Sequence, residues 1–134
     1  MEFEHGNAIC YSGYREGQSP QTQTFPSVEQ IREDLQILAA NWRYLRLYDC
    51  SLHAERVLNV IRNEGLPLKV MLGVDLAAEM SNPHCPWGAD FSDDVLYANH
   101  KSNAREVQRL IEYAKEFDDI IFSVSVGNEA SVEW

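Results

Sequence analysis

The sequence predicts an α/β fold in which about four parallel strands alternate with flanking helices, as in the N-terminal half of a (β/α)₈ TIM barrel. Short apolar runs alternate with amphipathic stretches along the 134 residues, which is typical of β/α units. In the last apolar run, side chains of different size alternate between the two faces. The larger side chains, which share one face, are Ile120, Phe122, Val124 and Val126. The other face carries the small residues Ser123, Ser125 and Gly127. Such a strand fits between outer helices and a crowded barrel interior.

The first β/α unit has the clearest helix signal. An apolar run at residues 7–11 predicts a strand, and residues 13–26, rich in Gly, Ser, Pro, Gln and Thr, predict a loop. Ser27 and Gln30 have the spacing of a capping box, so a helix is expected from Ser27 to about residue 40. Apolar residues follow at helical spacing, namely Val28, Ile31, Leu35 and Leu38.

The next two units are marked by turn and stop residues. Residues 44–48 and 68–74 are apolar runs that predict the second and third strands. Between them, a helix is expected over about residues 54–63, because Gly65 and Pro67 follow it as stop signals.

The fourth unit begins with a long connection. Residues 75–99 are predicted to be mainly loop, and loops of that length usually carry function or are disordered. Apolar spacing then predicts a helix over about residues 102–117 and a fourth strand over residues 120–126. A full barrel takes about 250 residues, so a single half-barrel domain is expected for residues 1–134.

Composition excludes several classes of partner. The net charge of -10 comes from 21 acidic and 11 scattered basic residues, so nucleic acid and anionic membrane are poor partners. No apolar stretch approaches the roughly 18 residues of a membrane helix, and the first five residues lack the basic and apolar regions of a signal peptide. The three cysteines and four histidines show no metal-ligand spacing. We therefore expect no metal and no cofactor.

The strongest candidate for chemistry is the pair Asn128 and Glu129, directly after the fourth predicted strand. Catalytic groups of (β/α)₈ barrels lie at the carboxyl ends of strands, where the βα loops open. An acid after a strand can equally be a helix N-cap or a solvated loop charge. Position alone therefore leaves both interpretations open.

Four segments in order give a more specific indication. They are Tyr11 after the first strand, residues 46–49, residues 70–74 and residues 124–130, each at the end of a predicted strand. Together they resemble family 17 of the glycoside hydrolases, the β-1,3-glucanases and related glucan-modifying enzymes. The resemblance covers nearly the whole chain, apart from loops such as residues 75–99.

The resemblance implies roles for five residues. Glu129 would be the general acid/base, with Asn128 contacting the sugar 2-hydroxyl beside it. Tyr11 and Tyr48 would line the sugar subsite, and Arg46 would lie near the catalytic nucleophile. The alternatives are that the tyrosines pack at the barrel rim and that Arg46 forms an ion pair with an acidic partner inside the barrel.

In this family the nucleophile comes from the seventh strand, which these residues do not include. The resemblance therefore implies part of a retaining glycoside hydrolase that acts on β-1,3-glucan, inactive as this chain alone. Two alternatives stay open: part of a β-1,3-glucanosyltransferase, and a non-catalytic half-barrel module that self-associates. The expected partners are a β-glucan and either the missing C-terminal half barrel or a second copy of the chain.

Overall fold

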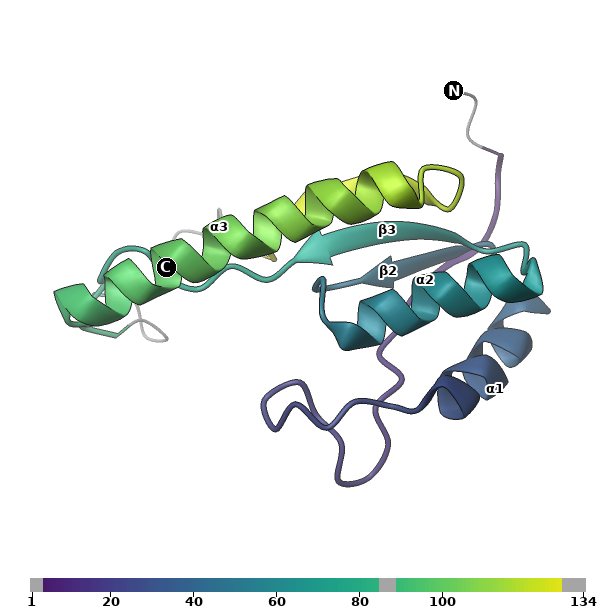
Figure 1. Ribbon diagram of the computed structural model, residues 1–134, viewed down its shortest axis with the longest axis horizontal. Helices are drawn as coiled ribbons and strands as arrows, with labels where there is room; N and C mark the ends of the chain where they lie inside the picture. The colour runs from purple at the N-terminus through teal and green to yellow at the C-terminus, as the bar shows by residue number, and fades with distance from the viewer. Residues whose placement is uncertain (1–3, 85–88, 129–134) are drawn as a thin grey trace.

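The computed structural model describes residues 4–84 and 89–128. One sheet of four parallel strands, in the order β1-β2-β3-β4, is flanked by helices (Figure 1). This confirms the predicted α/β class and is consistent with half of a (β/α)₈ barrel. The elements are β1 (Ala8–Cys10), α1 (Val28–Ala39), β2 (Tyr44–Leu47), α2 (Leu52–Glu64), β3 (Lys69–Val74), α3 (Asp93–Glu116) and β4 (Ile121–Val126).

The ends of the first two helices follow the capping signals of the sequence. The Ser27 hydroxyl accepts a hydrogen bond from the Gln30 backbone amide at 3.3 Å, and the Gln30 side chain accepts one from the Ser27 amide at 2.9 Å. The predicted capping box is therefore confirmed. α2 ends at Gly65, whose φ of 61° is the left-handed conformation that glycine adopts without strain. This helix starts slightly earlier than predicted because Ser51 caps it.

α3 is the element whose start was predicted wrongly. It begins at Asp93 rather than near residue 102, so the connection after β3 is shorter than expected. The first turn carries Asp93 and Asp94, which the helix dipole favours at this end. Figure 1 shows this end of α3 extending beyond the sheet. Residues that leave the core need no apolar face, and without one the periodicity gives no helix signal.

The hydrophobic core lies between one face of the sheet and the helices. The inward side chains of β2 and β3, such as Leu47 and Leu72, are at most 1% exposed. They meet apolar side chains of all three helices. The largest of these helix-side residues are Ile31, Leu35, Val57, Leu58, Ile61 and Phe117. The packing of helices on a single face leaves the other face of the sheet to line the barrel interior.

One prediction about the faces of the last strand was wrong. The pairing of β3 with β4 shifts after Val70, which leaves Phe122 as an extra residue in β4. Such a bulge breaks the alternation of side chains. The Phe122 ring lies 4.9 Å from the ring of Tyr44, on the face away from the helices. Beyond the bulge, Val124 pairs with the buried Leu72 and so faces the helix side as predicted.

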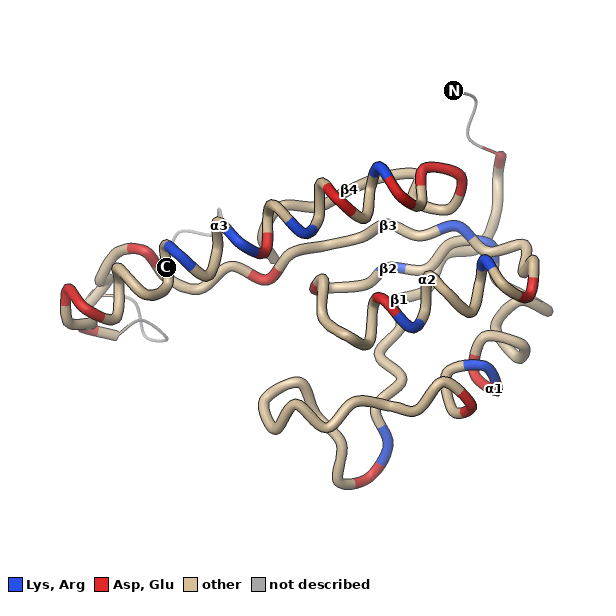
Figure 2. The backbone as a smooth tube through the Cα atoms, in the orientation of Figure 1, with Lys and Arg blue, Asp and Glu red and all other residues tan. Residues whose placement is uncertain are grey.

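Charged residues of both signs are spread along the helices, including the long α3 (Figure 2). Within residues 4–84 and 89–128, no helix combines the length and apolar character needed to cross a membrane.

Candidate functional site

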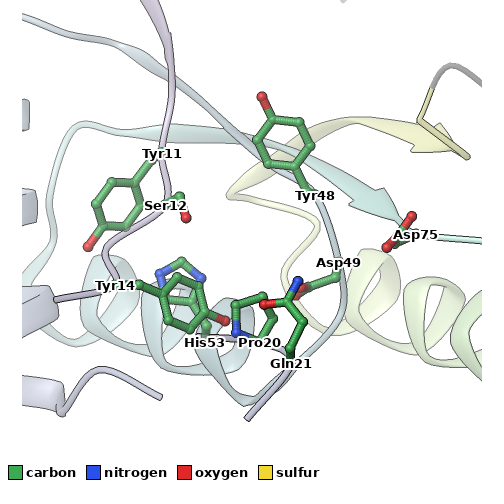
Figure 3. A pocket seen from close by; sticks show the side chains of 9 residues that line it. All are labelled: Tyr11, Ser12, Tyr14, Pro20, Gln21, Tyr48, Asp49, His53 and Asp75. Carbon is green, nitrogen blue, oxygen red and sulfur yellow. The ribbon is translucent and has the colours of Figure 1, made fainter. Parts of the chain in front are cut away.

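A pocket of about 440 Å³ lies at the carboxyl ends of the first three strands (Figure 3). Tyr11 follows β1, Tyr48 and Asp49 follow β2, and Asp75 follows β3. The remaining lining residues come from the loop after β1 and from the start of α2, namely Ser12, Tyr14, Pro20, Gln21 and His53. This is the end at which (β/α)₈ barrels place their active sites.

Tyr11 lines the pocket with its ring, while its hydroxyl faces α1. The hydroxyl donates a 2.9 Å hydrogen bond to Asp34 Oδ2, and Asp34 Oδ1 accepts a 2.7 Å hydrogen bond from Arg15 Nη2. Burial, and then the bond to Asp34, raise the pKa of Tyr11 well above its ordinary value. The hydroxyl is thus used in a hydrogen bond at the rim, and the ring is the part of Tyr11 that could contact a ligand in the pocket.

Tyr48, Arg46 and Asn128 form a connected group beside the pocket. The Arg46 guanidinium lies 4.7 Å from the centroid of the half-exposed Tyr48 ring, which is a cation–π contact. Arg46 Nη2 also donates a 2.8 Å hydrogen bond to Asn128 Oδ1. In the described part of the chain, no ion pair involves Arg46. The expected acidic partner is replaced there by a neutral amide and an aromatic ring.

The end of β4 is held close to β3. The Gly127 amide donates a 3.1 Å hydrogen bond to the Val74 carbonyl, and the φ of Gly127 is 82°. The left-handed conformation at Gly127 turns the chain into the exposed Asn128. Glu129, the predicted acid/base, lies outside the described residues.

His53 is a pocket residue that sequence reasoning missed. The spacing of the histidines indicates only that they form no metal site, and it points to no other role. The structure buries it at 5% exposure, with Nε2 accepting a 3.3 Å hydrogen bond from the Gly13 amide. A usable signal was its place at the start of a helix that follows a strand end, since such positions face the βα loops.

The pocket is acidic and extends toward α3. Its described lining includes the carboxylates of Asp49 and Asp75 and no lysine or arginine. An adjoining hollow of about 380 Å³ shares Asp49 and Asp75 and reaches Glu106 and Arg109 of α3. No group of three or more His, Cys, Asp or Glu side chains within the described ranges is placed to hold a metal ion.

No protein-family model, curated protein or solved structure matches this chain. The resemblance to glycoside hydrolase family 17 therefore rests on the four sequence segments, and the fold rests on the structure itself.

Proposed function

We propose that this chain supplies the N-terminal half of a retaining glycoside hydrolase for β-1,3-glucan, with Glu129 as the general acid/base. The observation that supports this most is the hydrogen bond from Arg46 to Asn128. This bond ties Asn128, the residue before Glu129, to the second strand. The pocket lies at the carboxyl ends of the strands, on the same side of the sheet. A proton donor at this edge would face a ligand in the pocket.

The pocket chemistry suits a neutral sugar. Carboxylates accept hydrogen bonds from hydroxyl groups, and Asp49 and Asp75 both line the pocket. Tyr48, which is 38% exposed, adds an aromatic ring. An anionic sugar would meet two carboxylates without a cationic side chain in the described lining.

The proposed chemistry needs two carboxyl groups. The acid protonates the glycosidic oxygen as the bond to the leaving sugar breaks, while a carboxylate about 5 to 5.5 Å away attacks the anomeric carbon. The resemblance assigns that nucleophile to a seventh strand. The acid/base residue then removes a proton from water in hydrolysis, or from a sugar hydroxyl in transfer.

Binding of sugar is the direct test of the pocket. We expect Tyr48→Ala to weaken binding of a β-1,3-linked glucose oligosaccharide about two- to twelvefold, since loss of an aromatic contact costs roughly 0.5 to 1.5 kcal/mol. Calorimetric titration of the 134-residue chain measures this. Tyr97→Ala is the matched control, because Tyr97 is 62% exposed on α3 and does not line the pocket. Equal affinities of the two variants would contradict the proposal.

Self-association is favoured by a separate observation, the uncovered face of the sheet. Register pairs put Cys10, Arg46 and Met71 on this face, where an almost entirely apolar hollow of about 230 Å³ also includes Tyr44 and Phe122. β1 and β4 are the edges of the described sheet. Unpaired edges and an apolar face favour association, with a C-terminal half barrel or with a second copy.

We therefore expect the isolated chain to form dimers at micromolar concentration. Met71→Lys should shift the mass toward the monomer, because it places a charge on the uncovered face. Ile37→Lys is the control, since Ile37 is 70% exposed on α1, which packs against the opposite face. Light scattering measures both variants, and a monomeric wild-type chain would rule out the dimer.

A further inference from the structure

One wall of the pocket is a short segment, residues 11–14, that leaves β1 and is fastened at three points. The Tyr11 amide donates to the Arg46 carbonyl at 3.0 Å. The Tyr11 hydroxyl donates to Asp34 at 2.9 Å. The Gly13 amide donates to His53 Nε2 at 3.3 Å. Of these three contacts, the one at His53 has an imidazole acceptor, the side chain whose unperturbed pKa lies closest to neutral pH.

His53 also supports the two aromatic rings of this wall. Its ring centroid lies 5.1 Å from that of Tyr14, with an angle of 28° between the planes. The Tyr11 ring lies 5.4 Å away at 37°. Both tyrosines line the pocket, and Figure 3 shows the His53 and Tyr14 rings facing one another. A movement of the histidine would therefore displace both tyrosines.

The hydrogen bond from Gly13 fixes the state of the imidazole. A nitrogen that accepts from an amide carries no proton, so the proton of neutral His53 is on Nδ1. Protonation would place an N–H at Nε2, opposite the Gly13 N–H, and two donors cannot bond to each other. Because His53 is 5% exposed, water has little access to replace the lost contact.

The surroundings of His53 favour the neutral ring. Burial lowers the pKa of His53 from its ordinary 6.5, and Arg56 acts in the same direction, while Asp49 and Asp34 oppose them. Burial is the largest of these effects. In the unfolded chain, His53 binds a proton at a higher pH than in the folded chain. The contribution of His53 to the stability of the fold is therefore fully present above about pH 6.5, and it is lost as the pH falls toward the pKa of the folded state.

We infer that His53 is a positioning residue whose neutral imidazole holds residues 11–14 as a wall of the pocket, so that the pocket binds its ligand well only while His53 is unprotonated. The inference rests on the proposed function only for the identity of the ligand, a β-1,3-linked glucose oligosaccharide.

Gly13 shows how tightly the wall is packed. A Cβ at this position would lie 2.2 Å from the Tyr11 hydroxyl oxygen and 2.8 Å from its Cζ. Tyr11 is 8% exposed and bonded to Asp34, so it has little freedom to move away. Gly13→Ala therefore displaces the wall while the histidine at position 53 is kept. We expect it to weaken ligand binding at every pH.

The test compares two replacements of His53. His53→Gln keeps an oxygen that can accept from Gly13 and does not titrate, whereas His53→Leu has no acceptor. Affinity for the oligosaccharide is measured by calorimetry between about pH 8 and pH 5. We expect wild-type affinity to fall about tenfold for each pH unit below the His53 pKa. The Gln variant should bind moderately at all pH values, and the Leu variant weakly at all of them.

Equal pH profiles for the wild type and His53→Gln would overturn the inference, since the titrating group would then be another residue. The NMR signal of the Gly13 amide, followed without sugar, separates this outcome from a failure of the proposed function. In the wild type, the Gly13 amide signal should shift over the same pH range in which the His53 ring titrates, and in the Gln variant it should not. That result would support the positioning role even if no oligosaccharide binds. An amide signal that does not titrate with the ring would overturn the role directly, including when His53→Leu fails to fold.

Discussion

Glu129→Gln, in a barrel that also contains the remaining strands, is expected to lower hydrolysis of unactivated β-1,3-glucan by about 10²- to 10⁴-fold. A carboxamide has nearly the same shape as a carboxyl group but cannot deliver a proton to the glycosidic oxygen. The sugar leaving group needs that proton because an alkoxide is a poor leaving group. The assay measures released reducing sugar with purified variant and wild type at matched concentration.

The choice of substrate makes this result diagnostic of acid catalysis. In an aryl glycoside, the phenolate leaves without being protonated. Cleavage of its glycosidic bond should therefore be much less affected by Glu129→Gln. The matched control is Glu112→Gln, since Glu112 is exposed on α3 and contacts Gln108 rather than the pocket. Unchanged glucan hydrolysis by the Glu129 variant would remove Glu129 from the acid/base role.

Most of the fold could be predicted because the signals were local. The Ser27 capping box and the stop at Gly65 act through contacts within a few residues, and both helix ends lie where these signals place them. The bulge at Phe122 could not be predicted in this way. It depends on how β4 pairs with β3, and alternation along one strand contains no information about pairing.

The places of Tyr11 and Tyr48 at strand ends could be predicted, but their contacts could not. Both tyrosines follow strands and line the pocket, whereas their role in a sugar subsite, which the resemblance implies, stays a prediction. The orientation of the Tyr11 hydroxyl toward Asp34 depends on how α1 packs, and the sequence separation of these two residues gives no hint of it. The contact between His53 and Gly13 could not be predicted for a similar reason, because the two residues lie in different β/α units.

The position of α3 on the sheet sets the shape of the hollow that adjoins the pocket, which together with the pocket forms a groove. α3 carries Glu106 and Arg109, which line the hollow that adjoins the pocket. Near the middle of the helix, the buried Asn103 accepts from the Ala77 amide at 2.9 Å and donates to the Ala77 carbonyl at 2.8 Å. This pair of hydrogen bonds clamps the chain after β3 to the helix. Whatever holds α3 on the sheet therefore also holds this part of the groove.

Phe117 is the residue that fixes the end of α3 to the sheet. It is 1% exposed, and its ring packs against the Arg62 guanidinium at 3.8 Å. The Phe117 carbonyl accepts hydrogen bonds from the Ile120 and Ile121 amides at 2.9 and 2.7 Å, which turns the chain into β4. The Tyr113 ring meets the Phe117 ring edge to face at 6.1 Å. Helix end, turn and strand start thus meet at one residue, whose ring is buried.

We expect Phe117→Ala to lower the free energy of unfolding by about 3 to 5 kcal/mol, because it removes a fully buried ring and leaves a cavity. Phe117→Leu should cost less, since it fills most of that space. Urea unfolding followed by circular dichroism measures both, with Tyr97→Ala as the surface control at a change within about 0.5 kcal/mol. Loss of this anchor releases the α3 side of the groove, so the Ala variant should also show faster amide exchange at Ala77 than the control. If Phe117→Ala were as stable as the Tyr97 variant, α3 would have to be held on the sheet by contacts other than this ring.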